Sequence, residues 1–134
     1  MNIKHHDITW ETISSLACTL ALQLEGKDHF DTIICIGRGG MIPARLLSER
    51  LDIKDIQFCK CHSYIGIRKQ AEMQIEDTLQ NVKGKTVLVV DDCLTSGKTI
   101  NAVYDLLTNK GATSIYIAVL YKNIHVEYPV QFAA

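Results

Sequence analysis

The sequence lacks an excess of charge of either sign, because 14 Lys and Arg residues stand against 15 Asp and Glu residues, a formal net charge of −1. Proteins that bind nucleic acid usually carry a basic patch, and none stands out here. No apolar run approaches the roughly 20 residues that cross a bilayer, and residues 1–7 lack the apolar core of a secretory signal. We therefore expect a cytoplasmic protein that binds neither nucleic acid nor membrane.

The five cysteines lack the spacing of a zinc site or a disulfide framework. Their number is odd, and the nearest pair, Cys59 and Cys61, has one intervening residue instead of two. We interpret them as buried thiols. A chain of 134 residues with a 47% hydrophobic share has the size and composition of one globular domain, so residues 1–134 are predicted to form a single unit.

Helical apolar spacing alternates along the chain with short, continuous apolar runs, which indicate strands buried on both faces. Helices are predicted over 9–24, 43–51 and 99–110, and strands over 32–36, 55–61, 86–90 and 114–121. Such alternation is typical of an α/β fold with a central, mainly parallel sheet flanked by helices. Residues 62–77 are polar without a clear period, and we expect a lid or binding loop there.

Ligands of parallel sheets bind beyond the carboxyl ends of the strands, where the sequence places Asp91 and Asp92. Two adjacent carboxylates suit the cis hydroxyls of a ribose or a hydrated divalent cation. Residues 95–99, Thr-Ser-Gly-Lys-Thr, bring amides and hydroxyls to a helix N-terminus, a good place for a phosphate. This is more than helix capping requires, and a P-loop is excluded because its first Gly would fall at position 92. A sugar phosphate is the predicted ligand.

A second loop, Gly37-Arg38-Gly39-Gly40, follows the preceding buried strand. It is not a dinucleotide fingerprint, because the third Gly of that motif would fall at Ile42. Glycines let the backbone approach an anion closely, and Arg38 adds a forked donor suited to phosphate oxygens. The loop therefore predicts a second anion site next to the first.

These residues resemble a known family. Residues 87–99 resemble the signature for 5-phosphoribosyl-1-pyrophosphate (PRPP) of type I phosphoribosyltransferases, and residues 36–44 resemble the pyrophosphate loop of its bacterial and archaeal xanthine-guanine and hypoxanthine branch. Ser63 and Tyr64 resemble the Ser-Tyr pair of that branch's lid. Lys122 stands where its members have a lysine that contacts the purine 6-oxo group. The resemblance spans about residues 8 to 123, in order.

The resemblance implies the type I phosphoribosyltransferase fold with a reduced hood, and an enzyme of purine salvage. Its members are Mg²⁺-dependent glycosyltransferases that move the 5-phosphoribosyl group from PRPP to a nucleobase, with a 6-oxopurine favoured here. A homo-oligomer, dimer or tetramer, and a non-proline cis peptide near Gly37-Arg38 are also implied. The resemblance implies that Asp91 and Asp92 bind the ribose hydroxyls and Mg²⁺. It implies that the 5-phosphate is bound by Thr95, Ser96, Gly97, Lys98 and Thr99. The pyrophosphate is implied to bind Arg38, Gly39 and Gly40.

Two departures from the branch leave the acceptor base open. Thr95 stands where 6-oxopurine enzymes usually have an Asp, proposed as a proton acceptor near N7 of the base. The branch also continues into a segment whose aromatic residue stacks on the base, whereas Trp10 is the one Trp of this chain, with Tyr128 or Phe132 as candidate substitutes. We favour a working transferase, with Thr95 grouped with Asp91 and Asp92 as its catalytic residues. A non-catalytic module that senses PRPP or a nucleotide, or a transferase for another base, is the alternative.

Overall fold

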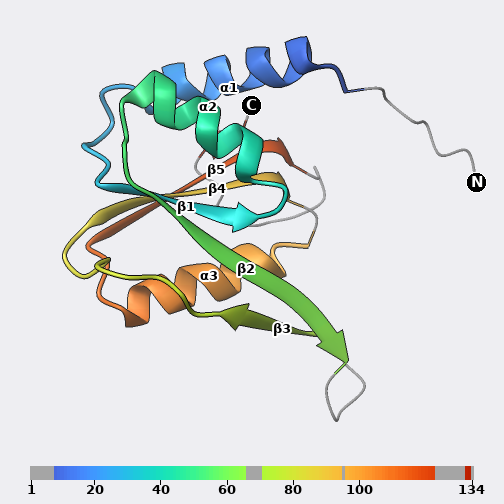
Figure 1. Ribbon diagram of the computed structural model, residues 1–134, viewed down its shortest axis with the longest axis vertical. Helices are drawn as coiled ribbons and strands as arrows, with labels where there is room; N and C mark the ends of the chain where they lie inside the picture. The colour runs from blue at the N-terminus through green and yellow to red at the C-terminus, as the bar shows by residue number, and fades with distance from the viewer. Residues whose placement is uncertain (1–7, 66–70, 95, 123–131, 134) are drawn as a thin grey trace, which may run out of the picture.

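The computed structural model describes residues 8–65, 71–94, 96–122 and 132–133. A six-stranded sheet crosses this part of the chain in the order β3-β2-β1-β4-β5-β6 (Figure 1). All pairs are parallel except β2 with β3, so the predicted α/β fold with a mainly parallel sheet is confirmed. The elements are α1 (Trp10–Leu24), β1 (Thr32–Gly37), α2 (Met41–Leu51), β2 (Ile56–Ile65), β3 (Ala71–Glu76), β4 (Thr86–Leu94), α3 (Lys98–Asn109), β5 (Ser114–Lys122) and β6 (Phe132–Ala133).

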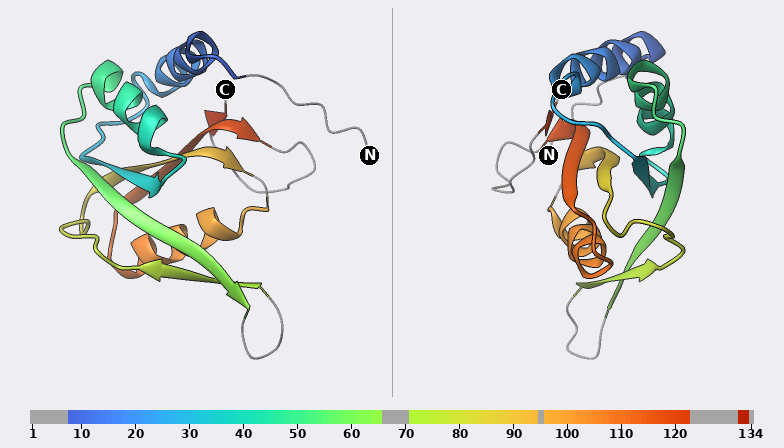
Figure 2. Two further views of the ribbon diagram at one scale, coloured as in Figure 1. Left: turned by 45° about the vertical axis from the view of Figure 1, so that its right-hand side comes forward. Right: turned by 90° about the vertical axis from the view of Figure 1, so that its left-hand side faces the viewer.

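Helices cover both faces of the sheet, with α1 and α2 on one side and α3 on the other (Figures 1 and 2). Successive residues of β1 divide between the two cores: Ile33 and Cys35 pack with α1 and α2, whereas Ile34 and Ile36 pack with α3. β4 divides in the same way. Because both faces of these strands are buried, the sequence shows continuous apolar runs instead of an alternation.

The helices begin and end close to the predicted residues. Thr9 caps α1, where its hydroxyl accepts a hydrogen bond of 3.1 Å from the amide of Thr12. α2 begins at Met41, two residues before the predicted start, and Pro43 lies in its first turn, where a missing N–H is tolerated. No helix in the described ranges is both long enough and apolar enough to cross a bilayer.

The segment 62–77, predicted to be a loop, is largely strand. β2 continues to Ile65, and β3 returns beside it as an antiparallel partner that lies next to α3 (Figure 2). Polar cross-strand pairs face each other, including Lys60 with Glu76 at 3.8 Å and His62 with Gln74 at 3.1 Å. Such pairs stabilise a sheet without producing a hydrophobic period. The prediction of an unstructured segment was therefore wrong for the part that is described.

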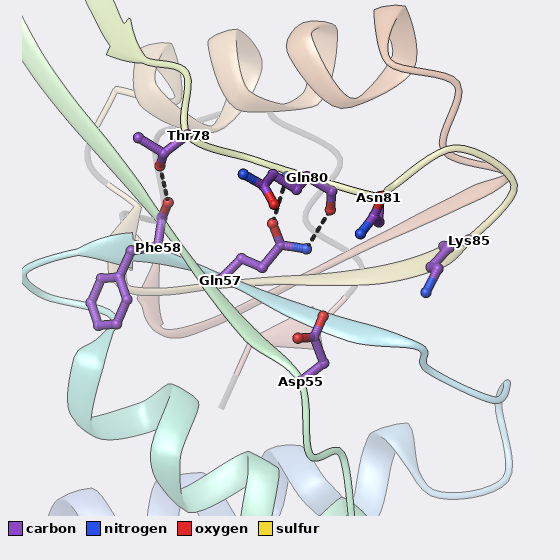
Figure 3. A pocket seen from close by; sticks show the side chains of 7 residues that line it. All are labelled: Asp55, Gln57, Phe58, Thr78, Gln80, Asn81 and Lys85. Atoms are coloured by element: carbon purple, nitrogen blue, oxygen red, sulfur yellow. Dashed lines mark hydrogen bonds between the residues drawn. The ribbon is translucent and has the colours of Figure 1, made fainter.

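The connection from β3 to β4 is fastened to β2 by side chains (Figure 3). The Gln57 amide donates to the carbonyl of Gln80 and accepts from its N–H, both at 2.8 Å, and the Thr78 hydroxyl donates to the carbonyl of Phe58 at 3.1 Å. The Gln57 side chain thus makes the two backbone hydrogen bonds that a strand residue would make, at a point where β3 no longer pairs with β2. A polar cavity of about 390 Å³ lies here, with Asp55 and Lys85 near the starts of β2 and β4.

Candidate active site

The carboxyl ends of β1 and β4 lie side by side, because the two strands pair in parallel from Thr32 opposite Val87 to Cys35 opposite Val90. This register brings the loop after β1 next to the two acids at the end of β4. A pocket of about 630 Å³ opens at this edge. Its lining unites five residues predicted from the sequence, Arg38, Gly39, Asp91, Asp92 and Thr99, with Ile36, Gly37 and Cys61.

The glycines after β1 are required by close packing. A Cβ added at Gly39 would overlap the carboxylate of Asp92. At Gly40 it would overlap the carbonyl of Val90 and lie 2.8 Å from the carbonyl of Ile36. The loop therefore lies directly against the ends of both strands, which a larger residue would prevent. The Gly37-Arg38 peptide is cis, as the family resemblance implied.

Asp91 is half-buried while its neighbour Asp92 is exposed. The amide of Asp92 donates to Oδ1 of Asp91 at 2.8 Å. Burial, which removes solvent from the ionised form, raises the pKa of Asp91 to about 7, and the adjacent Asp92 carboxyl adds to the rise. An ionised Asp91 is thus poorly stabilised by the protein alone, and a cation or hydroxyl donors in the pocket would stabilise it.

The N-terminus of α3 supplies the amides predicted to bind a phosphate. Gly97 precedes the helix with φ of 79°, a left-handed conformation that favours glycine. The hydroxyl of Ser96 accepts from the amide of Lys98 at 3.4 Å, and the first turn of α3 contains no acidic residue. Thr99 is half-buried, and its hydroxyl contacts the sulfur of Met73 on β3 at 3.9 Å. Thr95 lies outside the described residues.

Other predicted residues belong to the strands and the helix around this edge. Lys122 is exposed at the end of β5, opposite Leu94 of β4. Ser63 and Tyr64 belong to the backbone of β2, opposite Met73 and Glu72. The remaining predicted residues that do not line the pocket are Gly40, Ser96, Gly97 and Lys98.

Two features of this edge were not predicted from the sequence. Cys61 lines the pocket from β2, whose parallel pairing with β1 brings it to the same edge. The neighbouring Cys59 thiol forms a hydrogen bond with Cys61 and lowers its pKa, against the opposing effects of burial and the charge of Asp91. An apolar cavity of about 780 Å³ adjoins the pocket; it shares Arg38, Gly39 and Asp92, and its other lining residues include Met41, Ile42 and Leu120. In the sequence, the signal for the first feature is the pair Cys59 and Cys61 on a predicted strand. The signal for the second is the group of apolar residues at the start of a predicted helix.

The fold and this edge define an α/β protein with a pocket, lined by two carboxylates and a glycine-rich loop, at the carboxyl ends of parallel strands. Residues 2–134 match the family model described as phosphoribosyl transferase domain. The chain therefore belongs to the phosphoribosyltransferase family.

Relatives within this family act on purine bases by their names. The chain is 32% identical over 113 residues to a xanthine-guanine phosphoribosyltransferase of Desulfotalea psychrophila, covering 84% of this chain and 70% of that protein. It is similar to the crystal structure of a purine phosphoribosyltransferase from Pyrococcus horikoshii, with a TM-score of 0.83, 30% identity, and 95% and 84% of the two chains covered. It is also similar to the Helicobacter pylori xanthine-guanine-hypoxanthine phosphoribosyltransferase, with a TM-score of 0.85, 26% identity, and 96% and 85% covered.

The raised pKa of Asp91 makes the stability of the free protein depend on pH. An unfolded Asp ionises near pH 3.8, whereas folded Asp91 ionises near 7. The folded state therefore binds more protons between these values, and its stability falls as the pH rises from about 4 to 7. Replacing Asp91 with Asn removes this loss. We expect Asp91→Asn to be more stable than the wild type at pH 8 and to lose that advantage at pH 4.

The gain at pH 8 should be a few kcal/mol at most, because one pKa unit corresponds to about 1.4 kcal/mol and solvent screens a partly exposed group. Urea unfolding at both pH values measures it. The matched control is Asp105→Asn, which also removes one carboxylate but lies at an exposed position of α3. An equal gain in both variants at pH 8 would contradict the assignment to Asp91.

Proposed function

We propose that this phosphoribosyltransferase transfers the 5-phosphoribosyl group from PRPP to a 6-oxopurine, with Mg²⁺, as a cytoplasmic enzyme of purine salvage. The observation that carries the proposal is the meeting of three groups at one edge of the sheet: adjacent carboxylates, a Gly-Arg-Gly-Gly loop and a helix N-terminus. Each suits a different part of PRPP. The purine acceptor is supported by the names of the relatives.

Each part of PRPP has a counterpart among the described residues. The carboxylates of Asp91 and Asp92 accept hydrogen bonds from the two ribose hydroxyls. The amides at the start of α3, together with the hydroxyls of Ser96 and Thr99, hold the 5-phosphate. Arg38 and the backbone of Gly39 and Gly40 hold the pyrophosphate, which the glycines allow to approach closely.

The site also fits a hydrated Mg²⁺ ion. Mg²⁺ takes one or two carboxylates and completes its shell with water and phosphate oxygens, and Asp91 and Asp92 supply that donor set. Because burial holds the pKa of Asp91 high, a nearby cation would favour its ionised form. When bound, the ion neutralises charge on the leaving pyrophosphate and orients the ribose.

In the transfer, the bond from C1 of the ribose to pyrophosphate oxygen breaks and a bond to a ring nitrogen of the base forms. Positive charge develops on the ribose during this exchange, and the carboxylates of Asp91 and Asp92 stabilise it at close range. The two anion sites hold the sugar at both ends, which fixes C1 relative to the base. Lys122, at the end of β5, is proposed to donate a hydrogen bond to the 6-oxo group, and Ser63 and Tyr64 to cover PRPP.

The ribose and metal assignment is tested on PRPP binding. The Asp91→Asn, Asp92→Asn double variant should bind PRPP far more weakly than the wild type, because both ribose acceptors and both Mg²⁺ ligands lose their charge. Wild-type binding should be much tighter with Mg²⁺ than with EDTA. Calorimetry measures both, and circular dichroism checks the fold. Asp52→Asn and Asp105→Asn, changed together at surface positions, are the control. Unchanged PRPP affinity in the site variant would sink the assignment.

The acceptor base is tested at position 95. With Thr there, no carboxylate at that position takes a proton from the purine, so general-base help of about 10²–10⁴-fold should be missing. We expect slow turnover of hypoxanthine, guanine or xanthine and none of adenine, and a faster reaction in Thr95→Asp at saturating PRPP. Pyrophosphate release against a panel of purines, orotate and uracil measures this.

Two controls interpret that experiment. Thr113→Asp adds the same charge at an exposed residue before β5 and should change nothing. PRPP affinity is measured separately, because a carboxylate near the 5-phosphate can weaken it. If PRPP binds but neither wild type nor Thr95→Asp turns over a 6-oxopurine, the purine assignment is wrong. Turnover of orotate or uracil would then show another base, and no turnover at all would favour a sensing module.

We further propose a homo-oligomer, supported by exposed apolar side chains near the starts of α1 and α2. Ile8, Trp10, Met41 and Ile42 are between 41% and 71% exposed, and all but Trp10 line the apolar cavity. A second copy that covers them would remove this apolar area from water. Light scattering should give a mass above 15.0 kDa, reduced in Trp10→Glu but not in Leu22→Glu on the same helix. A monomeric wild type would contradict the proposal.

A further inference from the structure

Two cysteine sulfurs lie close together in the wall of the pocket. Cys59 and Cys61 are two residues apart on β2, so their side chains point to the same face, and their Sγ atoms are 3.8 Å apart. Cys59 is fully buried, whereas Cys61 is half-buried and lines the pocket beside Asp91. One sulfur is therefore reachable from the pocket and the other lies directly behind it.

We propose that Cys59 and Cys61 form an oxidisable dithiol, a modification site at which a hydroperoxide converts the pair to a disulfide. Cys61 attacks first because the pocket gives it access, and Cys59 resolves the product. The remaining cysteines, all in the described part of the chain, form no second sulfur–sulfur contact: Cys18 and Cys93 are at least partly exposed and Cys35 is buried. Access combined with a partner distinguishes this pair from an isolated surface thiol.

The chemistry balances with a hydroperoxide as the oxidant. The Cys61 thiolate attacks one peroxide oxygen, the O–O bond breaks, and an alcohol or water leaves as Cys61 becomes a sulfenic acid. The Cys59 sulfur then attacks the Cys61 sulfur, the S–S bond forms, and the sulfenic hydroxyl leaves as water with the Cys59 proton. Two thiols are oxidised, and the peroxide is reduced to one alcohol and one water, or to two waters when it is hydrogen peroxide. A thiol reductant reverses the change by exchange.

The strand geometry makes this disulfide closable but strained. Two residues of extended strand span about 6.6 Å between Cα atoms, near the upper end of the roughly 4.4–6.8 Å that disulfides accept. The sulfurs must also move from 3.8 Å to about 2.05 Å. Closure therefore requires β2 to shorten locally. Strain of this kind makes a disulfide easier to reduce, which suits a reversible modification.

Shortening of β2 acts directly on the loop after β1. Cys59 is paired with Ile36, and Lys60, between the two cysteines, is paired with Gly37, the last residue of β1. A bend at Lys60 displaces Gly37 and hence Arg38, and it moves the Cys61 sulfur in the pocket wall. The effect on PRPP rests on the proposed function, whereas the disulfide itself does not.

Peptide mapping of the folded full chain tests the disulfide. Protein treated with a modest excess of hydrogen peroxide is blocked with N-ethylmaleimide and digested with trypsin, which cuts after Lys54, Lys60 and Arg68. We expect residues 55–60 and 61–68 to appear joined, lighter than the reduced peptides by two hydrogen atoms, and separate again after reduction. Loss of the joined product in Cys61→Ser and its persistence in Cys18→Ser support the pair.

Two further results bear on the pair. In Cys59→Ala, Cys61 should proceed to sulfinic acid because no resolving thiol remains. Cys61→Ser, a change at the half-buried position, should instead leave Cys59 reduced, because the thiol that reacts first is gone. A disulfide that joins other cysteines, one that forms only in urea, or Cys61 that stays fully reactive toward maleimide after peroxide would overturn the proposal.

Calorimetry with PRPP separates this proposal from the proposed function. Oxidised wild type should bind PRPP about tenfold or more weakly than reduced protein, because the loss of one hydrogen bond to a charged group corresponds to about a tenfold change in affinity, and reductant should restore binding. Reduced protein that fails to bind PRPP contradicts the proposed function and leaves the mapped disulfide standing. If reduced protein and oxidised protein with the mapped disulfide bind PRPP with equal affinity, the link between β2 and the loop after β1 is overturned.

Discussion

The parallel pairing of β1 with β4 is the constraint on which the site depends. Both strands are buried on both faces, so their register is fixed by the two cores at once. A slip of one residue would turn Ile33 and Leu88 toward the wrong helices and would also separate Gly39 from Asp92. The same apolar contacts that stabilise the sheet therefore place the glycine-rich loop against a pair of carboxylates. Stability and binding geometry are not independent here.

That geometry leaves a charge problem at the sheet edge. Asp91 extends a strand whose preceding residues are completely buried, and Asp92 stands next to it. Because the pKa of Asp91 is about 7, a large share of the free protein carries a protonated Asp91 near neutral pH. Ligand hydroxyls or a cation would replace the missing solvent. A site whose carboxylates lack stabilising partners is well suited to a ligand that brings both hydroxyl groups and a cation.

The sequence predicted those parts of the molecule where local pattern and tertiary environment agree. The continuous apolar runs in Thr32–Gly37 and Thr86–Leu94 form buried strands, and the helical apolar period in Lys98–Asn109 forms a helix. Asp91, Asp92, Arg38 and Gly39 were found because each follows a buried strand. The hairpin of β2 and β3 was missed because polar pairs hold it together, as Lys60 with Glu76 does. The place of Cys61 in the pocket wall depends on β2 pairing with β1, and a single sequence does not show which strands are neighbours.

β2 differs from the other strands because its two halves pair with different partners. Its first half pairs in parallel with β1 and buries Cys59, while its second half extends past β1 and pairs with β3 alone. The changeover falls at Lys60, the one residue paired with both Gly37 and Glu76. β3 in turn contacts α3 through Met73 and Thr99. A change in β2 near Lys60 would therefore reach the loop after β1 directly and α3 through β3. The loop after β1 and the start of α3, separated along the chain by three strands, are thus both connected to β2, and the thiol pair flanks the residue where this strand changes partners.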